Sequence, residues 1–260
     1  MENKVETAAP AASGPRGVVV TGGGTGIGRA TAHAFADRGA DVLVVGRSGT
    51  ALKETAEGRP RIRTLAVDLT LPDAPGRVVT QALAELGRID VLVNNAAAGG
   101  HGSLADTTPQ QAENLLRINL VTPVLLTRAA LDALEETRGT VVNISSSGSV
   151  GRRAWPDNSL YGASKSALDF LTRTWAVELA PRGIRVLGLA PGVIDTGIGL
   201  RMGMSPEAYD GFLAHMGSRT PAGRVGTAEE IAWWIIQLAE PAAVYATGTV
   251  PVVDGGLSLA

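Results

Sequence analysis

The sequence predicts an α/β fold in which a doubly wound, seven-stranded parallel sheet carries helices on both faces. Short apolar runs rich in β-branched residues alternate along the chain with longer amphipathic stretches, as repeated βαβ units require. The runs are apolar at nearly every position, which is typical of parallel strands buried on both faces.

The expected elements extend over almost the whole chain. Strands are predicted at residues 17–21, 41–46, 63–69, 89–95, 140–145, 184–190 and 249–256. A helical pattern that includes Ile27, Ala30 and Ala34 follows the first strand, and helical patterns over 72–87, 108–136, 159–180 and 227–240 precede the fourth, fifth, sixth and last. No linker interrupts the series, so we expect one domain over 16–260 after a disordered tail over 1–15.

Composition excludes several classes of function. The net charge is −2 and no basic stripe is present, which argues against a nucleic-acid partner. Apolar runs are too short to cross a bilayer, and the N-terminus has no apolar signal-peptide segment, so we expect a cytoplasmic protein. Cysteine is absent and His33, His101 and His215 are far apart, so no metal site is expected.

A glycine-rich loop joins the first strand to the first helix. Gly22, Gly26 and Gly28 fit the spacing G-x-x-x-G-x-G, and Thr21 precedes them. Unpaired N–H groups at a helix N-terminus bind anions, and glycine lets the backbone approach them closely. The loop therefore predicts the phosphate-binding turn of a Rossmann-type dinucleotide fold.

The end of the second strand indicates which dinucleotide is bound. A fold that prefers NAD(H) places an acid there against the ribose 2′-hydroxyl. Here Gly46 takes that place, beside Arg47 and Ser48. A guanidinium binds a 2′-phosphate well, so NADP(H) is favoured over NAD(H); the alternative is an ordinary exposed arginine.

Tyr161 and Lys165 suggest acid–base chemistry. They are four residues apart in an expected helix, hence on one face. A nearby ammonium stabilises a phenolate, so we expect it to lower the pKa of the tyrosine. The segment "NISSSGS", from Asn143 to Ser149, ends the preceding strand and offers hydroxyls to hold a substrate carbonyl.

Together these residues resemble the short-chain dehydrogenase/reductase family. The motifs "TGGGTGIG", "VDL", "NNAA", "INL", "NISSS", "YGASK" and "PGVIDT" occur in the family's order and approximate spacing, from Arg16 to the C-terminal "VDGGLSL". The type resembled is the single-domain kind that includes 3-oxoacyl-carrier-protein reductases and ketoreductases of secondary metabolism.

The resemblance implies four catalytic residues. Tyr161 would be the acid/base, Lys165 would lower its pKa and bind the nicotinamide ribose, and Asn119 would hold a water of the proton relay. Ser146 would orient the carbonyl. Its separation from Tyr161 is two residues longer than is usual in the family, so Ser147 remains an alternative and Ser145 a less favoured one.

The resemblance also implies the cofactor site. Asp68, with Leu69 beside it, would bind the adenine, and Pro191 to Thr196 would hold the nicotinamide carboxamide. The full expected set is Thr21, Gly22, Gly24, Thr25, Gly26, Ile27, Gly28, Arg47, Ser48, Asp68, Leu69, Asn95, Ala96, Ala97, Tyr161, Lys165, Pro191, Gly192, Val193, Ile194 and Thr196.

The substrate pocket departs from the family pattern. Ala97 stands where glycine is usual, Leu187 where asparagine is common, and two extra residues precede Tyr161. We expect the substrate near His101, Ser147, Arg152, Arg153 and Trp155. Two guanidiniums and an indole suit an anionic or aromatic substrate; the alternative is that the arginines face solvent and the tryptophan packs.

Two further segments predict a substrate lid and a subunit contact. Residues 196–226 interrupt the helix–strand pattern, and we interpret them as a substrate lid. The helix before the last strand contains Trp233 and Trp234. Adjacent positions do not share a helix face, so we expect one in the core and one at a subunit contact. The resemblance implies a homotetramer or homodimer.

The resulting hypothesis is an NADPH-dependent carbonyl reductase. Hydride would pass from the nicotinamide to a small or polyketide-like ketone, and Tyr161 would donate the proton. One alternative is a 3-oxoacyl-carrier-protein reductase, for which Arg138 and Arg182 would meet an acidic acyl carrier protein at the entrance. Another is an alcohol dehydrogenase working in the oxidative direction. A non-catalytic NADP(H)-binding sensor is the remote alternative.

Overall fold

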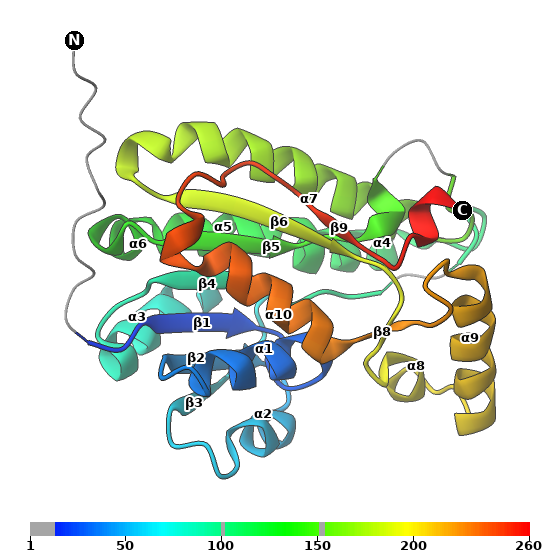
Figure 1. Cartoon of the computed structure of the whole chain (residues 1–260), viewed down its shortest axis with the longest axis horizontal. Coiled ribbons are helices and arrows are strands. Elements are labelled where there is room, and N and C mark those ends of the chain that lie inside the picture. The colour runs from blue at the N-terminus through cyan, green and yellow to red at the C-terminus, as the bar shows by residue number, and fades with distance from the viewer. Residues whose placement is uncertain (1–13, 100–101, 151–153) are drawn as a thin grey trace.

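The computed structural model describes residues 14–99, 102–150 and 154–260. Apart from Gly14 and Pro15, the predicted tail lies outside this range. The sheet has seven parallel strands in the order β3-β2-β1-β4-β5-β6-β9, with helices on both sides (Figure 1). The predicted α/β, doubly wound, Rossmann-type fold is confirmed.

All seven predicted strands form, and the first two have the predicted bounds. The last is shorter than expected, with only two residues in the sheet. The strands are β1 (Gly17–Thr21), β2 (Asp41–Gly46), β3 (Ile62–Ala66), β4 (Val91–Asn94), β5 (Thr140–Ile144), β6 (Arg185–Pro191) and β9 (Val252–Val253). A separate pair, β7 (Ile194–Asp195) and β8 (Gly226–Thr227), was not expected.

The helices alternate with the strands, and α2 was not among those expected from the sequence. They are α1 (Gly26–Ala36), α2 (Gly49–Ala56), α3 (Ala74–Leu86), α4 (Pro109–Leu116), α5 (Thr122–Ala129), α6 (Leu131–Thr137), α7 (Ser159–Glu178), α8 (Ile198–Arg201), α9 (Pro206–Arg219) and α10 (Ala228–Ala239).

The sheet separates two apolar cores because successive strand side chains point to opposite faces. Val18 and Val20 of β1 pack on one face with residues of α1 and α10. Val19, between them, packs on the other face with residues of α3, α5 and α7. Both faces are therefore covered, which explains the nearly uniform apolar character of the strands.

The stretch 108–136, expected as one helix, is divided into three. A π-helical segment, Arg117–Val121, separates α4 from α5. Pro123 follows it and has no N–H, so the carbonyl of Asn119 loses its α-helical donor. A π-bulge accommodates this loss while the chain continues in the same direction.

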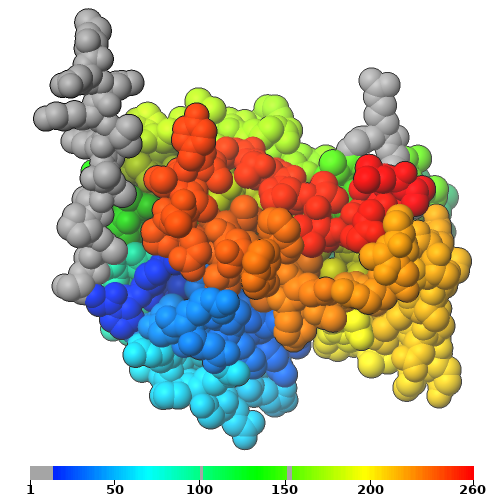
Figure 2. Space-filling view, in the orientation of Figure 1, coloured from blue at the N-terminus to red at the C-terminus, as the bar shows by residue number. Residues whose placement is uncertain are grey.

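The expectation that one of Trp233 and Trp234 lies in the core is wrong, because both are exposed. Their exposed fractions are 50% and 37%, and their rings meet edge to face with centroids 5.3 Å apart. The positions of α10 that face the sheet hold smaller residues, including Ile231, Ile235 and Ile236. α10, orange in Figure 2, lies open across the face shown there.

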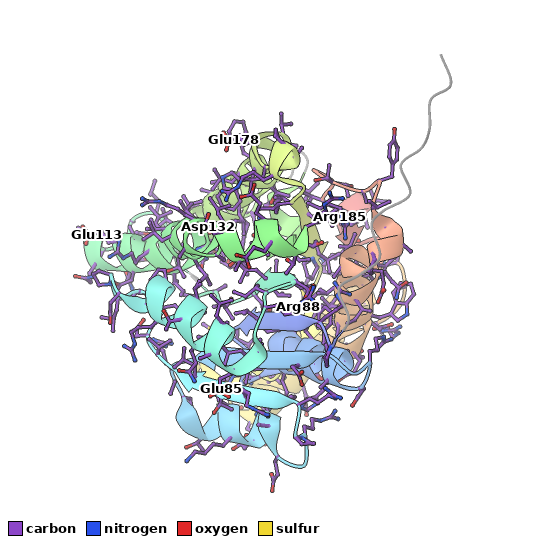
Figure 3. All side chains as sticks on the ribbon, turned by 90° about the vertical axis from the view of Figure 1, so that its left-hand side faces the viewer. Glu85, Arg88, Glu113, Asp132, Glu178 and Arg185 are labelled. Atoms are coloured by element: carbon purple, nitrogen blue, oxygen red, sulfur yellow. The ribbon has the colours of Figure 1, made fainter. Side chains whose placement is uncertain are left out.

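The amino edge of the sheet, which faces the viewer in Figure 3, carries ion pairs. Arg182, just before β6, binds Glu135 at 2.7 Å and Asp132 at 2.8 Å. Arg138 ends α6 just before β5. The proposed role of Arg138 and Arg182 at a substrate entrance is therefore wrong, because ligand sites of such sheets lie at the carboxyl edge.

The described part of the chain contains neither a membrane-spanning helix nor a cluster of metal ligands. No helix there is long and apolar enough to cross a bilayer. No cluster of three His, Asp or Glu side chains there could hold a metal ion.

Candidate active site

The predicted site residues converge at the carboxyl edge of the sheet. The glycine loop follows β1, Arg47 follows β2, Asn95 follows β4, Ser146 follows β5 and Gly192 follows β6. Neighbouring parallel strands end side by side, so segments far apart in sequence become adjacent. This is where open α/β sheets bind ligands.

The glycine loop folds tightly on itself. Gly22 has φ +65° and Gly26 has φ +50°, conformations that side chains rarely tolerate. A Cβ on Gly28 would lie 2.3 Å from the carbonyl oxygen of Gly22. A Cβ on Gly26 would lie 2.8 Å from the Cβ of Thr196. Glycine is therefore required here for packing between the loop and its protein neighbours, before any ligand is considered.

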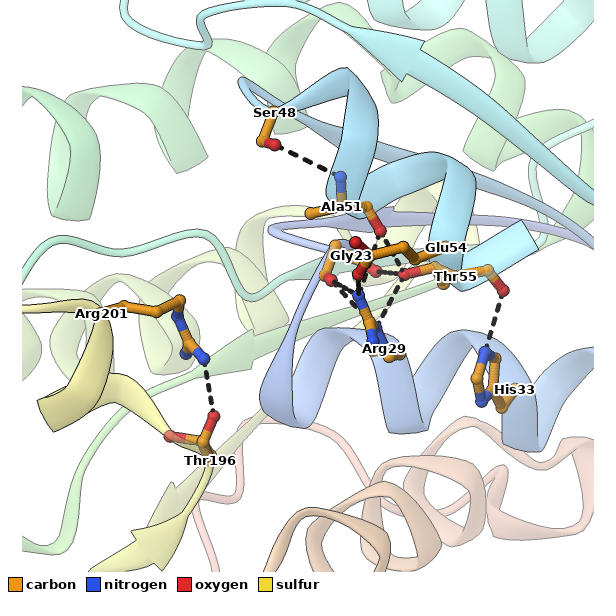
Figure 4. Close-up of polar contacts among 10 residues, drawn as sticks. Gly23, Arg29, His33, Ser48, Ala51, Glu54, Thr55, Thr196 and Arg201 are labelled. Carbon is orange, nitrogen blue, oxygen red and sulfur yellow. Dashed lines mark hydrogen bonds and ion pairs between the residues drawn. The ribbon is translucent and has the colours of Figure 1, made fainter. Parts of the chain in front are cut away.

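Arg29 fastens the loop to α2 (Figure 4). Its Nη2 donates to the carbonyl of Gly24 at 2.6 Å and to Glu54 at 2.8 Å. The hydroxyl of Thr55 donates to the carbonyl of Gly23 at 3.0 Å. Through these contacts α2 supports the outer side of the loop. None of them uses the N–H groups at the N-terminus of α1.

The first turn of α1 supplies free donors. The Thr25 side chain makes no capping hydrogen bond, and the N–H groups of Ile27 and Gly28 donate to no group in the described residues. Unpaired N–H groups at a helix N-terminus carry partial positive charge. The loop thus fits the pyrophosphate of a dinucleotide.

Arg47 and Asp68 lie close to each other beyond β2 and β3. Thr70 binds the Asp68 carboxylate through its N–H at 2.9 Å and its hydroxyl at 2.7 Å. These bonds lower the pKa of Asp68, and the charge of Arg47 contributes to the same effect. Ser48, by contrast, caps α2 by accepting from the N–H of Ala51 at 3.3 Å, and the Leu69 side chain is in the core. Only the Leu69 backbone is therefore left to meet a ligand.

Thr21 and Asn95 join the ends of β1 and β4. The Thr21 hydroxyl accepts from the N–H groups of Asn95 and Ala96, both at 3.0 Å. The Asn95 amide donates to the carbonyl of Thr21 at 2.8 Å. These side chains therefore hold the two strand ends together at the carboxyl edge of the sheet.

Tyr161 and Ser146 form the centre of the candidate site. The Ser146 hydroxyl lies close enough to the phenol to act on its pKa, and Ser146 Oγ accepts from the N–H of Gly148 at 3.3 Å. Burial raises the pKa of Tyr161, and the Ser146 hydroxyl opposes part of the rise. The expected lowering is not found in the protein alone, because desolvation of the phenolate outweighs the favourable contacts.

Lys165 lies one helical turn beyond Tyr161 and is buried. Its Nζ donates to the carbonyl of Ile144 at 2.7 Å and lies 5.7 Å from the centroid of the Tyr161 ring. Burial lowers the pKa of Lys165 to about 8, while Asp169 acts in the opposite direction. The ammonium is held between the Tyr161 ring and the end of β5.

Asn119, in the π-helical segment, is fully buried. Its Oδ1 accepts from the N–H of Ala98 at 2.8 Å, and its Nδ2 donates to the carbonyl of Ala98 at 3.0 Å and to Ser164 Oγ at 3.1 Å. Ser164 Oγ donates in turn to the carbonyl of Tyr161 at 2.7 Å. The side chain thus connects the loop after β4 to α7.

The expected lid is attached to the turn after β6. The buried Tyr209 of α9 donates to Asp195 Oδ1 at 2.9 Å and accepts from the N–H of Gly197 at 3.0 Å. Arg201 of α8 donates to the carbonyl of Thr196 at 2.9 Å (Figure 4). In Figure 2, α8 and α9 form a gold lobe at one end of the molecule.

A cavity of about 390 Å³ is lined in part by Leu160, the residue before Tyr161. The loop after β4 contributes Ala98 and Gly99, α4 contributes Leu115, the residue before Tyr161 is Leu160, and the expected lid contributes Met202. Residues of the segment before α4, of α4 itself and of the start of α7 with the two residues before it complete the described lining: Gly102, Asp106, Thr107, Gln111, Asn114, Asp157, Asn158 and Ser159.

Of the expected substrate residues, two can be placed. Ser147 is buried at the start of a 3₁₀ turn, Ser147–Ser149. Trp155 meets Tyr161 edge to face with centroids 5.6 Å apart and covers Gly148, where a Cβ would lie 2.0 Å from the indole. His101, Arg152 and Arg153 lie outside the described residues.

Sequence reasoning missed several residues that hold this site together: Arg29, Thr55, Ser164, Asp169 and Tyr209. Each acts by hydrogen bonds to a segment distant in sequence. Asp169 alone carried a usable signal, since an acid one turn after Lys165 is on the same helix face.

Comparisons with known proteins agree with this geometry. Residues 22–258 match a family model described as enoyl-(acyl carrier protein) reductase. An uncharacterised oxidoreductase of Mycobacterium tuberculosis is 38% identical over 92% of this chain and 91% of its own. A 3-oxoacyl-acyl-carrier-protein reductase of Thermotoga maritima is 36% identical over 92% of this chain and 96% of its own.

A solved structure agrees as well. A short-chain dehydrogenase/reductase of unknown function from Caenorhabditis elegans, determined with its cofactor, is 35% identical to this chain. It superposes with a TM-score of 0.89 over 95% of this chain and 96% of its own.

Proposed function

The chain belongs to the short-chain dehydrogenase/reductase family and is an oxidoreductase of alcohol or ketone groups, and from this premise we propose that it is an NADP(H)-dependent carbonyl reductase. The observation that carries the proposal is the Tyr161 phenol, with the Ser146 hydroxyl acting on its pKa and Lys165 Nζ 5.7 Å from its ring centroid. When bound, the nicotinamide would supply the hydride that reduces the carbonyl carbon.

Ser146 and Tyr161 have different roles at the carbonyl oxygen of the substrate. The Ser146 hydroxyl donates a hydrogen bond that orients the oxygen, and the Tyr161 hydroxyl gives it the proton that completes the alcohol. The raised pKa of Tyr161 keeps the phenol protonated at neutral pH, as a proton donor must be.

Lys165 and Asn119 support the return of a proton to Tyr161. The Lys165 ammonium stabilises the phenolate that remains after proton transfer. The Asn119 side chain is bound to Ala98 and Ser164, so we place a relay water at the Asn119 carbonyl. That carbonyl lacks its α-helical donor because Pro123, four residues further on, has no N–H.

NADP(H) rather than NAD(H) is proposed from the end of β2. Gly46 stands where an acid would repel a 2′-phosphate, and Arg47 follows it beside Asp68. Arg47 is exposed and free to turn its guanidinium toward a phosphate.

A small ketone is favoured over a carrier-bound acyl chain as the substrate. The cavity beside Leu160 and Met202 is about 390 Å³, which suits a small molecule. Arg138 and Arg182 were the basic residues suggested for a carrier protein, and they lie at the opposite edge of the sheet. We propose that α8 and α9, within residues 196–226, act as the lid of this cavity.

The experiment that tests the function is NADPH oxidation with a panel of ketones. Replacing Tyr161 by Phe removes the proton donor and should lower kcat by about 10²–10⁴-fold with little change in NADPH affinity. Tyr245→Phe, at a fully exposed position, is the matched control. Retention of most of the rate by Tyr161→Phe would refute the mechanism. NADPH binding by the intact protein without turnover of any ketone would favour the sensor alternative.

A further inference from the structure

Asp169 is a buried carboxyl group that the proposed mechanism does not use. It lies in α7 with 6% of its surface exposed. Its Oδ1 makes no hydrogen bond with any described residue. Burying a carboxylate with an unsatisfied oxygen costs free energy, so a compensating role for this side chain is expected.

One role is mechanical. Asp169 Oδ2 lies 3.0 Å from Ser149 Oγ. Ser149 Oγ is also 2.6 Å from the carbonyl oxygen of Ser146 and 3.2 Å from Ser145 Oγ. The carboxylate thus connects α7, which carries Tyr161, to the loop that carries Ser146.

The other role is electrostatic. Asp169 follows Lys165 by one helical turn, so the two side chains are neighbours on one face. Lys165 is buried and its ammonium has one hydrogen bond to the protein, to the carbonyl of Ile144, among the described residues. Arg173, on the next turn, is the other charged group near Asp169. The Ser145 and Ser149 hydroxyls face Asp169 from the loop after β5.

We propose that Asp169 is a positioning residue for this reaction, which holds the Ser146 loop against α7 through Ser149 and keeps Lys165 charged. The inference rests on the proposed function, because Ser146, Tyr161 and Lys165 act there together. Burial lowers the pKa of Lys165 and the Asp169 carboxylate raises it, so the acid offsets part of the desolvation of the ammonium.

The electrostatic role can be measured without substrate. The chain has only three lysines, Lys4, Lys53 and Lys165, so ¹³C-labelled lysine gives three NMR signals whose shifts can be followed against pH. Asp169→Asn keeps the shape of the side chain and removes its charge. The Lys165 titration should move down by at least about one pH unit. Glu178→Gln, the same change at the exposed end of α7 (Figure 3), should leave it in place.

The mechanical role has its own variant. Ser149→Ala removes the hydroxyl between Asp169 and Ser146 and leaves both charges in α7. It should lower kcat at least roughly tenfold, because the contacts of the hydroxyl with Asp169, the Ser146 carbonyl and Ser145 are all lost, while the Lys165 titration stays near its wild-type position. In Asp169→Asn the high-pH limb of the kcat profile should move down together with the Lys165 titration.

The outcomes separate the two proposals. An unchanged Lys165 titration in Asp169→Asn overturns the electrostatic role, and an unchanged kcat in Ser149→Ala overturns the mechanical one. A Lys165 shift in a protein that reduces no ketone would leave the electrostatic inference standing and count against the proposed function.

Discussion

The buried ammonium of Lys165 donates to the carbonyl of Ile144 at 2.7 Å. This single contact fixes the lysine to the last residue of β5, directly before the serine loop. Burial lowers the pKa of Lys165 from 10.5 to about 8, so its charge state changes within the pH range in which the enzyme can be studied.

The lowered pKa predicts a pH-dependent stability. Between about pH 8 and 10.5 the unfolded chain binds more protons than the folded one, so Lys165 makes stability rise with pH in that window. Relative to Lys165→Met, the free energy of unfolding of the wild type should rise by about 2 kcal/mol between pH 7 and 9.5. Urea unfolding at several pH values measures this. A difference between wild type and Lys165→Met that stays constant across this pH range would contradict the shift.

The choice of Ser146 as the orienting hydroxyl predicts unequal effects within the serine loop. The Ser146 hydroxyl acts on the pKa of Tyr161 and accepts from the N–H of Gly148, whereas Ser147 makes no side-chain hydrogen bond with the described residues. Ser146→Ala should lower kcat by about 10²–10³-fold, and Ser147→Ala by less than about tenfold. Steady-state kinetics with one ketone decides between them. A larger loss in Ser147→Ala would reassign the role.

Arg47 should discriminate between the two dinucleotides. Losing a charge-assisted bond to the 2′-phosphate costs about 1.5–3 kcal/mol, so Arg47→Ala should weaken NADPH binding by about 10–100-fold and NADH binding little. Fluorescence titration measures both affinities. Arg61→Ala removes an arginine that pairs with Asp41 at the amino end of β2 and should change neither. Equal losses for the two cofactors in Arg47→Ala would refute the phosphate contact.

Tyr209 should hold the expected lid closed at its base. Its hydroxyl bridges Asp195 and the N–H of Gly197. Tyr209→Phe leaves both without that partner, which costs about 1–3 kcal/mol and should speed amide exchange in α8 and α9 by about tenfold. Hydrogen–deuterium exchange with mass spectrometry measures this, with the peptides of β1 as the internal reference. Unchanged exchange in α8 and α9 would mean that the hydroxyl does not hold the lid.

The exposed tryptophans of α10 predict a subunit interface. Two large apolar side chains open to solvent side by side are typical of buried contacts in assemblies. Trp233→Glu should therefore shift the protein to a smaller species in light scattering coupled to size exclusion. Leu83→Glu, on the exposed side of α3, is the control. An unchanged mass for Trp233→Glu would exclude α10 from the interface.

The sequence was most informative where structure depends on local chemistry. The bounds of β1 and β2 were predicted to the residue because buried parallel strands show as uninterrupted apolar runs. The helical pattern over 159–180 placed Tyr161 and Lys165 on one face correctly. The break of 108–136 was not foreseen, although Pro123 was visible, because a helix can absorb a missing N–H by bulging or by ending.

The sequence by itself determined the sheet, the glycine loop and the spacing of Tyr161 and Lys165, since these follow from periodicity and from residue type. Tertiary structure alone decided that Ser146 meets Tyr161, that Arg29 holds the glycine loop and that Asp169 reaches Ser149. It also decided the direction in which the pKa of Tyr161 is shifted. Hydrogen-bond partners and desolvation depend on which distant segments meet at the carboxyl edge, and the order of residues along the chain does not contain that information.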